Sequence, residues 1–312
     1  MKYFFKKLTS LIITLFLISI LAFLAFQIIP GDPAVSKLGT EATPERLEAL
    51  REEMGLNRPV VVRYLIWLQE FLTGDMGTSY NYDLSVREML GNRVPVTAAL
   101  SLLSFFLIIL ISIPVGVLSS KNVDGLASRL TAVVNQVIMA VPPFFLGIFF
   151  TLIFGFIFQL FTPGIFVAYQ ESPGQFFVYL LFPALAIAIP KSAMAVKFLR
   201  GSISDELNRD YVRTAYSRGN TRTAVLYRHV LRNALIPVVT FLTMTLADIV
   251  ASGIIIEQVF SIPGIGRLLL SSIGTRDYPI VQAIVVLLAF IVVLLNFITD
   301  LLYKYVDPRI KI

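Results

Sequence analysis

Charged side chains inside apolar stretches are the groups of this sequence best placed to act on a solute. Asp248 lies near the middle of one such stretch and Glu257 at its end, and Lys191 follows Pro190 in another. A charge in the hydrocarbon of a bilayer costs about 3 kcal/mol on insertion scales and normally faces protein or water. Asp248 therefore either lines a polar path or hydrogen-bonds a nearby hydroxyl group or another helix. Lys191 either extends toward the membrane surface or lines the inner mouth of a path.

Groups for covalent or metal chemistry are scarce. The chain has no cysteine, and its single histidine, His229, has no second histidine or cysteine with which to share a metal. The patterns G-x-S-x-G, H-E-x-x-H and G-x-x-x-x-G-K-[ST] do not occur. We therefore expect no catalytic residue, no metal site and no nucleotide site in this chain. An intramembrane enzyme is excluded on the same grounds.

The elements that position these charges are membrane spans. Hydrophobic residues make up 56% of the 312 residues and charged residues only 15%, which is typical of an integral membrane protein. Six stretches are long enough to cross a bilayer, at about 8–29, 96–118, 131–161, 176–196, 236–256 and 280–303. The first is too long for a signal peptide and lacks a cleavage site. Kinks are predicted at Pro142, Pro143, Pro183 and Pro190.

The distribution of charge predicts the orientation. With six spans, the termini and two loops share one side, which holds sixteen Lys and Arg against five Asp and Glu, whereas the other side holds nine against thirteen. By the positive-inside rule the basic side is cytoplasmic, so both termini lie inside. Topology and contact with anionic lipids explain the basic excess, and nucleic acid is not expected as a partner.

The outer segment, residues 30–95, is predicted to fold as a helical lid. Thr43 suits an N-cap, with Pro44 at the first helical position and Gly55 in the left-handed conformation at the end. A second helix, ended by Gly74, is predicted at the membrane interface or against the bundle. Its apolar stripe consists of Val61, Leu65, Leu68 and Leu72. Beyond the fifth span, Ser261, Pro263, Gly264 and Gly266 predict a re-entrant or gate-like loop.

The inner loop, residues 198–235, has the spacing of two short helices. Asp210 is predicted to cap a helix over 211–218, in which Tyr211 and Ala215 share a face and which ends at Gly219. Such a helix suits docking in a groove of another protein. A solvated, charged loop against lipid headgroups is the alternative, and the residue pattern alone favours neither.

The second of these helices connects the inner loop to the fifth span. Thr221 is its predicted N-cap, and Arg228 and Arg232 are four residues apart on it.

Several motifs together resemble one family. The run RDYVRTAYSRG followed by RHVLRNALIP resembles the EAA loop of ABC-type importer permeases, in the form found in the oligopeptide, dipeptide and nickel branch. IIPGDP, FLTGDMGTSY, EQVFSIPGIGRLL, RDYPIVQA and the tail DPRI resemble the same branch in order and spacing. Arg213, Thr214 and Ala215 stand where the general pattern has Glu-Ala-Ala, which argues for this branch and against sugar or amino-acid permeases.

The resemblance implies an all-α polytopic membrane protein with six spans and both termini inside, in a bacterial or archaeal cytoplasmic (inner) membrane. It implies three parts: a first span with the outer segment (1–95), a permease core (96–303) and a cytoplasmic tail (304–312). ATPase-coupling residues are implied within the inner loop, and these are Asp210, Tyr211, Arg213, Thr214, Ala215, Gly219, Arg228 and Arg232. Asp248, Glu257 and Lys191 are the candidates for the translocation path.

The implied partners are a second homologous permease, two cytoplasmic ATP-binding subunits and an extracytoplasmic solute-binding protein that delivers peptide. ATP and magnesium would bind those ATPase subunits and not this chain, which is no enzyme by itself. A nickel chelate is the alternative cargo. A secondary transporter is the alternative mechanism, but it normally shows internal repeats, and none is visible.

The topology can be tested by cysteine labelling, because the native chain has no cysteine. We expect an impermeant thiol reagent to label a cysteine at position 48, in the outer segment, and not one at position 213, in the inner loop, when cells are intact. Labelling at 213 but not at 48 would reverse the assigned orientation.

Overall fold

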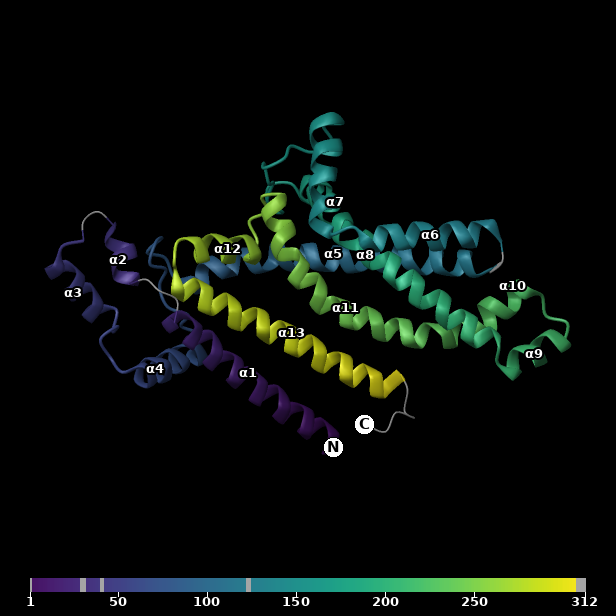
Figure 1. Ribbon diagram of the computed structural model, residues 1–312, viewed down its shortest axis with the longest axis horizontal. Helices are drawn as coiled ribbons and strands as arrows, with labels where there is room; N and C mark the ends of the chain where they lie inside the picture. The colour runs from purple at the N-terminus through teal and green to yellow at the C-terminus, as the bar shows by residue number, and fades with distance from the viewer. Residues whose placement is uncertain (1, 29–31, 40–41, 122–124, 307–312) are drawn as a thin grey trace. The chain divides into compact units, whose positions relative to one another are not determined.

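The computed structural model describes residues 2–28, 32–39, 42–121 and 125–306, and its regular elements are helices (Figure 1). The first span is α1 (Lys2–Ile28), and the outer segment contains α2 (Pro33–Leu38), α3 (Pro44–Glu53) and α4 (Val60–Thr73). Then follow α5 (Val86–Ser120), α6 (Leu126–Ala140), α7 (Pro143–Phe150), a π-helical segment (Thr151–Ile157) and α8 (Pro173–Leu207). The remainder comprises α9 (Asp210–Ser217), α10 (Arg222–Val225), a second π-helical segment (Leu226–Val230), α11 (Leu231–Val259), α12 (Ile265–Gly274) and α13 (Tyr278–Val306).

Five helices in the described residues are long and apolar enough to cross a membrane, and there are six spans when a bent pair of helices is counted as one. The helical fold and the membrane spans predicted from the sequence are therefore confirmed. Several helices extend beyond the predicted apolar stretches. Helix α5 begins at Val86, well before the predicted stretch at 96–118, and α8 continues to Leu207, beyond the predicted stretch at 176–196.

The third span is sharply bent. Residues 131–161 were predicted to form one kinked span, but the helices before and after Pro142 meet at 93°. Pro142 has extended backbone angles (φ −63°, ψ 142°), because the residue before a proline is disfavoured in the α conformation, and Pro143 begins α7. The kinks predicted at Pro183 and Pro190 do not interrupt α8.

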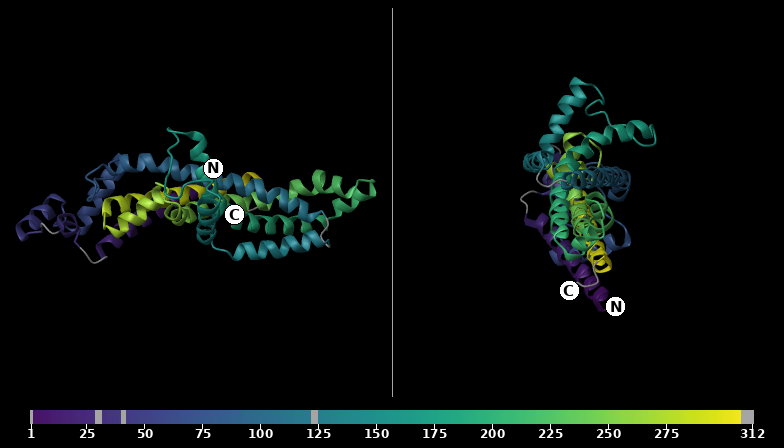
Figure 2. Two further views of the ribbon diagram at one scale, coloured as in Figure 1. Left: turned by 90° about the horizontal axis from the view of Figure 1, so that it is seen from above. Right: turned by 90° about the vertical axis from the view of Figure 1, so that its right-hand side faces the viewer.

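The chain forms two compact units, one of which comprises residues 98–262 and 298–312. Here α8 packs against α11, α6 and α7. Helices α5 and α8 approach closely, because a Cβ atom added to Gly116 would lie 2.6 Å from Leu199 Cδ2. The Tyr179 hydroxyl group donates a hydrogen bond to the Phe260 carbonyl oxygen. In this unit the α9–α10 turn lies at the same end as the last residues of α5 and the first residues of α6 (Figures 1 and 2), as the charge distribution requires of two cytoplasmic loops.

The other unit comprises residues 1–97 and 263–297. The outer segment is folded in part as predicted: the Thr43 hydroxyl group caps α3, and Gly55 and Gly74 have φ of 66° and 90°. The side of α4 that faces α1 is aromatic, with Tyr64 and Trp67 against Phe23. The predicted stripe of aliphatic residues on α4 is largely exposed, which favours the membrane interface over the bundle among its two predicted places. The loop predicted after the fifth span contains the short apolar helix α12.

Candidate functional site

The inner loop is a packed helical turn and not a solvated loop. Helix α9 ends before Gly219, which has φ 81°, and the Thr221 hydroxyl group accepts a hydrogen bond from the Ala224 amide. The loop has its own apolar interior, formed by Val212, Ala215, Val225, Leu226 and Val230. Burial of these side chains fixes the loop as a rigid projection at this end of its unit.

Two details of the predicted inner loop are corrected. Asp210 is the first residue of α9, and Arg209 stands at the N-cap without a side-chain hydrogen bond, so Asp210 is not the cap. Its carboxylate still favours the helix start, because it lies at the positive end of the helix dipole. The two arginines do not share one α-helix either, since Arg228 lies in a π-helical turn over Leu226–Val230 and Arg232 lies in α11. Both arginines are exposed.

Ala215 does not lie on an open docking face. It is 6% exposed, because this side of α9 packs against the loop's own interior. The accessible side of α9 includes Arg213, Thr214 and Tyr216. A partner that docks on α9 would therefore meet these three side chains.

Tyr211 ties the inner loop to the two long helices on either side of it. Its hydroxyl group donates to Glu206 Oε2 on α8 at 2.5 Å and accepts from Asn233 Nδ2 on α11 at 3.3 Å. Burial and the hydrogen bond to Glu206 raise the pKa of Tyr211, so the phenol remains a donor at neutral pH. The loop and the two helices are thus mechanically connected.

An ion pair joins α8 and α11. Lys191 Nζ lies 3.0 Å from Asp248 Oδ2, and the two side chains are 19% and 67% exposed. The hydroxyl groups of Thr243 and Thr245 donate to carbonyl oxygens of their own helix. Asp248 therefore contacts another helix. Most of its side chain is nevertheless exposed at the surface of the unit, and an exposed carboxylate is unfavourable against lipid.

Glu257 does not face an open path. It is fully buried within α11, close to the end of the helix at Val259. The sequence places Glu257 at the outer end of its span. How much of its side chain is exposed depends on the packing around the residue, which the sequence does not show.

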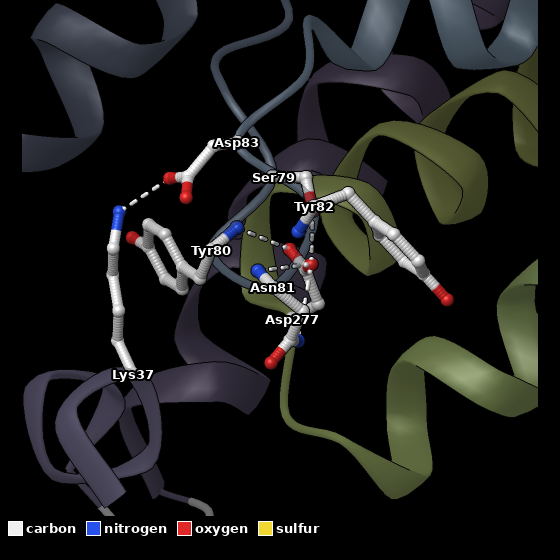
Figure 3. Close-up of polar contacts among 7 residues, drawn as sticks. All are labelled: Lys37, Ser79, Tyr80, Asn81, Tyr82, Asp83 and Asp277. Carbon is white, nitrogen blue, oxygen red and sulfur yellow. Dashed lines mark hydrogen bonds and ion pairs between the residues drawn. The ribbon is translucent and has the colours of Figure 1, made fainter.

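Asp277 is the functional candidate that the sequence did not single out (Figure 3). Its fully buried carboxylate, just before α13, accepts hydrogen bonds from the 79–81 segment of the outer region. The Ser79 hydroxyl group lies 2.5 Å from Oδ2, and the Tyr80 amide lies 3.2 Å from Oδ1. The Asn81 amide and Nδ2 each lie 3.2 Å from Oδ2. One carboxylate thus fastens the segment after α4 to the start of α13.

A cavity of about 1010 Å³ adjoins this fastening in the same unit. Its wall includes Arg63, Trp67, Tyr80 and Tyr278. Burial lowers the pKa of Arg63 and raises the pKa of Tyr80 to about 12, so the phenol is neutral at physiological pH. At the rim, Lys37 Nζ lies 2.7 Å from Asp83 Oδ1 (Figure 3).

Metal ligation is not indicated by the described part of the chain. Within residues 2–28, 32–39, 42–121 and 125–306, no three His, Cys, Asp or Glu side chains are grouped so that they could hold a metal ion.

Comparison with known proteins places these features in context. Residues 112–312 match the family model described as "Binding-protein-dependent transport system inner membrane component", and residues 1–101 match the corresponding N-terminal model. A probable peptide ABC transporter permease of Sinorhizobium fredii is 33% identical over 312 residues, 99% of each chain. An oligopeptide transport system permease of Bacillus subtilis is 34% identical over 94% of each chain.

A glutathione transport system permease of Pectobacterium atrosepticum is 32% identical over 100% of this chain and 99% of its own. Among solved structures, a chain of the MetNI methionine ABC transporter in an inward-facing conformation superposes with a TM-score of 0.56. It is 18% identical, and the match covers 70% of this chain and 96% of that chain. This likeness shows a shared fold.

The Asp277 fastening can be tested with Asp277→Asn. The amide presents donors to donors, so we expect the local stability of the 79–82 segment to fall by about 2 kcal/mol. Hydrogen exchange at these amides should become roughly thirtyfold faster.

Asp83→Asn is the matched control in the same segment. It removes an exposed ion pair, so the local stability of the segment should fall by less than about 0.5 kcal/mol and hydrogen exchange should hardly change. Equal exchange in the two variants would show that Asp277 does not hold the segment.

Proposed function

Because the chain belongs to the family of binding-protein-dependent transport system inner membrane components, we propose that it forms a path for peptides with a second, homologous permease. The chain is the membrane-embedded, non-ATPase subunit of an ABC importer in the inner membrane. The names of the relatives support peptides over a nickel chelate as the cargo. The observation that carries the proposal is the rigid inner loop, which offers a partner a defined helical face.

Two cytoplasmic ATPase subunits would drive the transporter through the inner loop. Closure of the ATPase pair on ATP would move the docked α9, and Tyr211 would pass this movement to α8 and α11 through Glu206 and Asn233. Because its buried apolar side chains are closely packed, the loop would transmit this movement and would not deform under it. Arg213, Thr214 and Tyr216 would form the contact, while Ala215 and Gly219 would shape the loop.

The path would pass the face of α11 that presents Asp248. Exposed residues recur along this face at helical spacing, at Met244, Asp248, Ala251 and Ile255. A second permease and the solute between the two subunits would cover this stripe, because a carboxylate is costly against lipid. Lys191 would neutralise Asp248 when no cargo is present.

A solute-binding protein would deliver the cargo to the outer segment. The Asp277 fastening supports this role, because a force on the 79–81 segment acts directly on the start of α13. The outer segment therefore has a physical connection to a membrane helix.

The coupling role can be tested with the double variant Arg213→Glu and Tyr216→Ala. Arg and Tyr at a docking face each contribute about 2 kcal/mol when they are hot spots, so binding of the ATPases should weaken by thirtyfold or more. Co-purification of the ATPases and peptide uptake should both be lost, while the chain still inserts.

Arg129→Glu, on α6, is the control for charge reversal at an exposed position outside the inner loop. Ala215→Glu is not diagnostic, since a buried charge would unfold the loop itself. Uptake at the parent rate in the double variant would refute coupling through this face.

The ion pair can be tested by comparing Asp248→Asn, Lys191→Met and the variant with both changes. Each single variant leaves one charge without its partner, so uptake should fall in both. If the pair acts on the solute, the double variant should assemble normally and still fail in uptake. Recovery of uptake in the double variant would show that the pair has only a structural role.

A further inference from the structure

A polar pocket of about 350 Å³ lies between α5, α6 and α8, at the end of the unit that also holds the inner loop. Its wall includes Ser119 and Ser120 at the end of α5, Asn135 on α6, and Lys197, Arg200 and Gly201 on α8. Since this end carries the basic loops, the positive-inside rule places the pocket at the cytoplasmic surface of the membrane. None of the features above accounts for the pocket.

The charge of the pocket favours an anion. Its eleven lining residues include two cations, Lys197 and Arg200, and no Asp or Glu. Arg200 is oriented by a hydrogen bond from Nη2 to Ser128 Oγ at 2.7 Å. Lys197 is exposed, so its ammonium group can reach a ligand in the pocket. Two cations without a neighbouring carboxylate attract a phosphodiester group, whose single negative charge they more than balance.

Asn135 gives an independent indication of a ligand. Its side chain lines the pocket and is only 8% exposed, and its Nδ2 has no hydrogen-bond partner among the described residues. Buried donors in native proteins are rarely left unpaired, and each exception requires an explanation. A ligand oxygen in the pocket would accept this hydrogen bond.

The surroundings identify the source of that oxygen. Next to the pocket, α6 presents an exposed apolar face that includes Leu130, Val133 and Val137. A free phosphate ion would make no use of this face, whereas the acyl chains of a phospholipid would lie along it while the headgroup enters the pocket. We propose that the pocket binds the phosphate of an anionic phospholipid of the cytoplasmic leaflet, such as phosphatidylglycerol.

A fluorescence experiment on the assembled importer tests this proposal. A single cysteine, Val133→Cys, is labelled with a fluorophore beside the pocket, and the complex is placed in phosphatidylcholine nanodiscs. Phosphatidylglycerol with a spin-labelled chain should quench this fluorophore more than phosphatidylcholine with the same label at equal fraction. Unlabelled phosphatidylglycerol should compete with the spin-labelled lipid and remove the excess quenching. Equal quenching by the two lipids would overturn the proposal.

Inorganic phosphate distinguishes the two sources of the anion. We expect millimolar phosphate to leave the excess quenching unchanged, because the ion lacks the contact with the apolar face. Displacement of the lipid by phosphate at that concentration would assign the pocket to the free ion and overturn the lipid assignment.

Substitutions in the pocket should act selectively. Lys197→Gln should weaken the apparent affinity for phosphatidylglycerol about fivefold, and Arg129→Gln, an equal loss of charge outside the pocket, should not. Gly201→Leu should abolish the excess quenching by phosphatidylglycerol. A Cβ atom at this position meets no atom within 4 Å, so the leucine side chain can occupy the pocket without strain. Gly174→Leu, at the other end of α8, is the steric control.

Asn135→Leu separates binding from packing. If the amide contacts the headgroup, the variant loses lipid selectivity. If selectivity is unchanged and only the melting temperature rises, the unpaired amide is a packing defect and its part in the proposal is wrong. Equal losses in Lys197→Gln and Arg129→Gln would show general surface attraction and contradict a defined site.

Discussion

The hydrocarbon core of the bilayer provides no water to satisfy a polar group, and this constraint decides where each charge of the chain can lie. Backbone groups are paired within helices, so irregular segments are confined to the membrane surfaces and to breaks such as Pro142. Lys191 and Asp248, which lie inside the spans, pair with each other at 3.0 Å. The exposed side of that pair is costly against lipid, and in the proposed function a second permease and the solute cover it.

In the proposed function, energy and cargo reach the path from opposite surfaces of the membrane, and the structure has a hydrogen-bonded attachment near each surface. On the inner side, the phenol of Tyr211 joins a short helix to the long α8 and α11. On the outer side, the buried carboxylate of Asp277 joins the outer segment to α13. Each attachment includes a hydrogen bond to a carboxylate, Glu206 on the inner side and Asp277 on the outer side, and such bonds are stronger than those between neutral groups. A permease without an ATPase site of its own depends on attachments of this kind to respond to its partners.

Local features of the fold could be predicted from the sequence, and non-local ones could not. The spans follow from apolar stretches of bilayer length, and Thr43, Gly55, Gly74 and Thr221 mark helix ends through short-range capping. Asp277 lies in the motif RDYPIVQA and Ser79 in FLTGDMGTSY, but their pairing was missed because the two residues are almost 200 positions apart in the sequence. The adjacent prolines indicated a kink but not its 93° angle.

The candidate site shows the same limit. Helical spacing placed Tyr211 and Ala215 on one face, but only the packing of the loop shows that Ala215 is buried while Arg213 and Tyr216 are accessible. Glu257 was named as a candidate for the path from its place at the end of a span, and its full burial is likewise a property that only the packing shows. The side that a short helix presents to its own chain is a tertiary property, which periodicity does not determine.

Reconstituted transport tests the central claim most directly. The chain would be placed in sealed vesicles with its partner permease and ATPases, and the binding protein and a labelled peptide would be added on the side of the outer segment. The account predicts that peptide accumulates only when ATP is present on the side of the inner loop. Peptide accumulation by the two permeases without the ATPases, driven by an ion gradient, would contradict it.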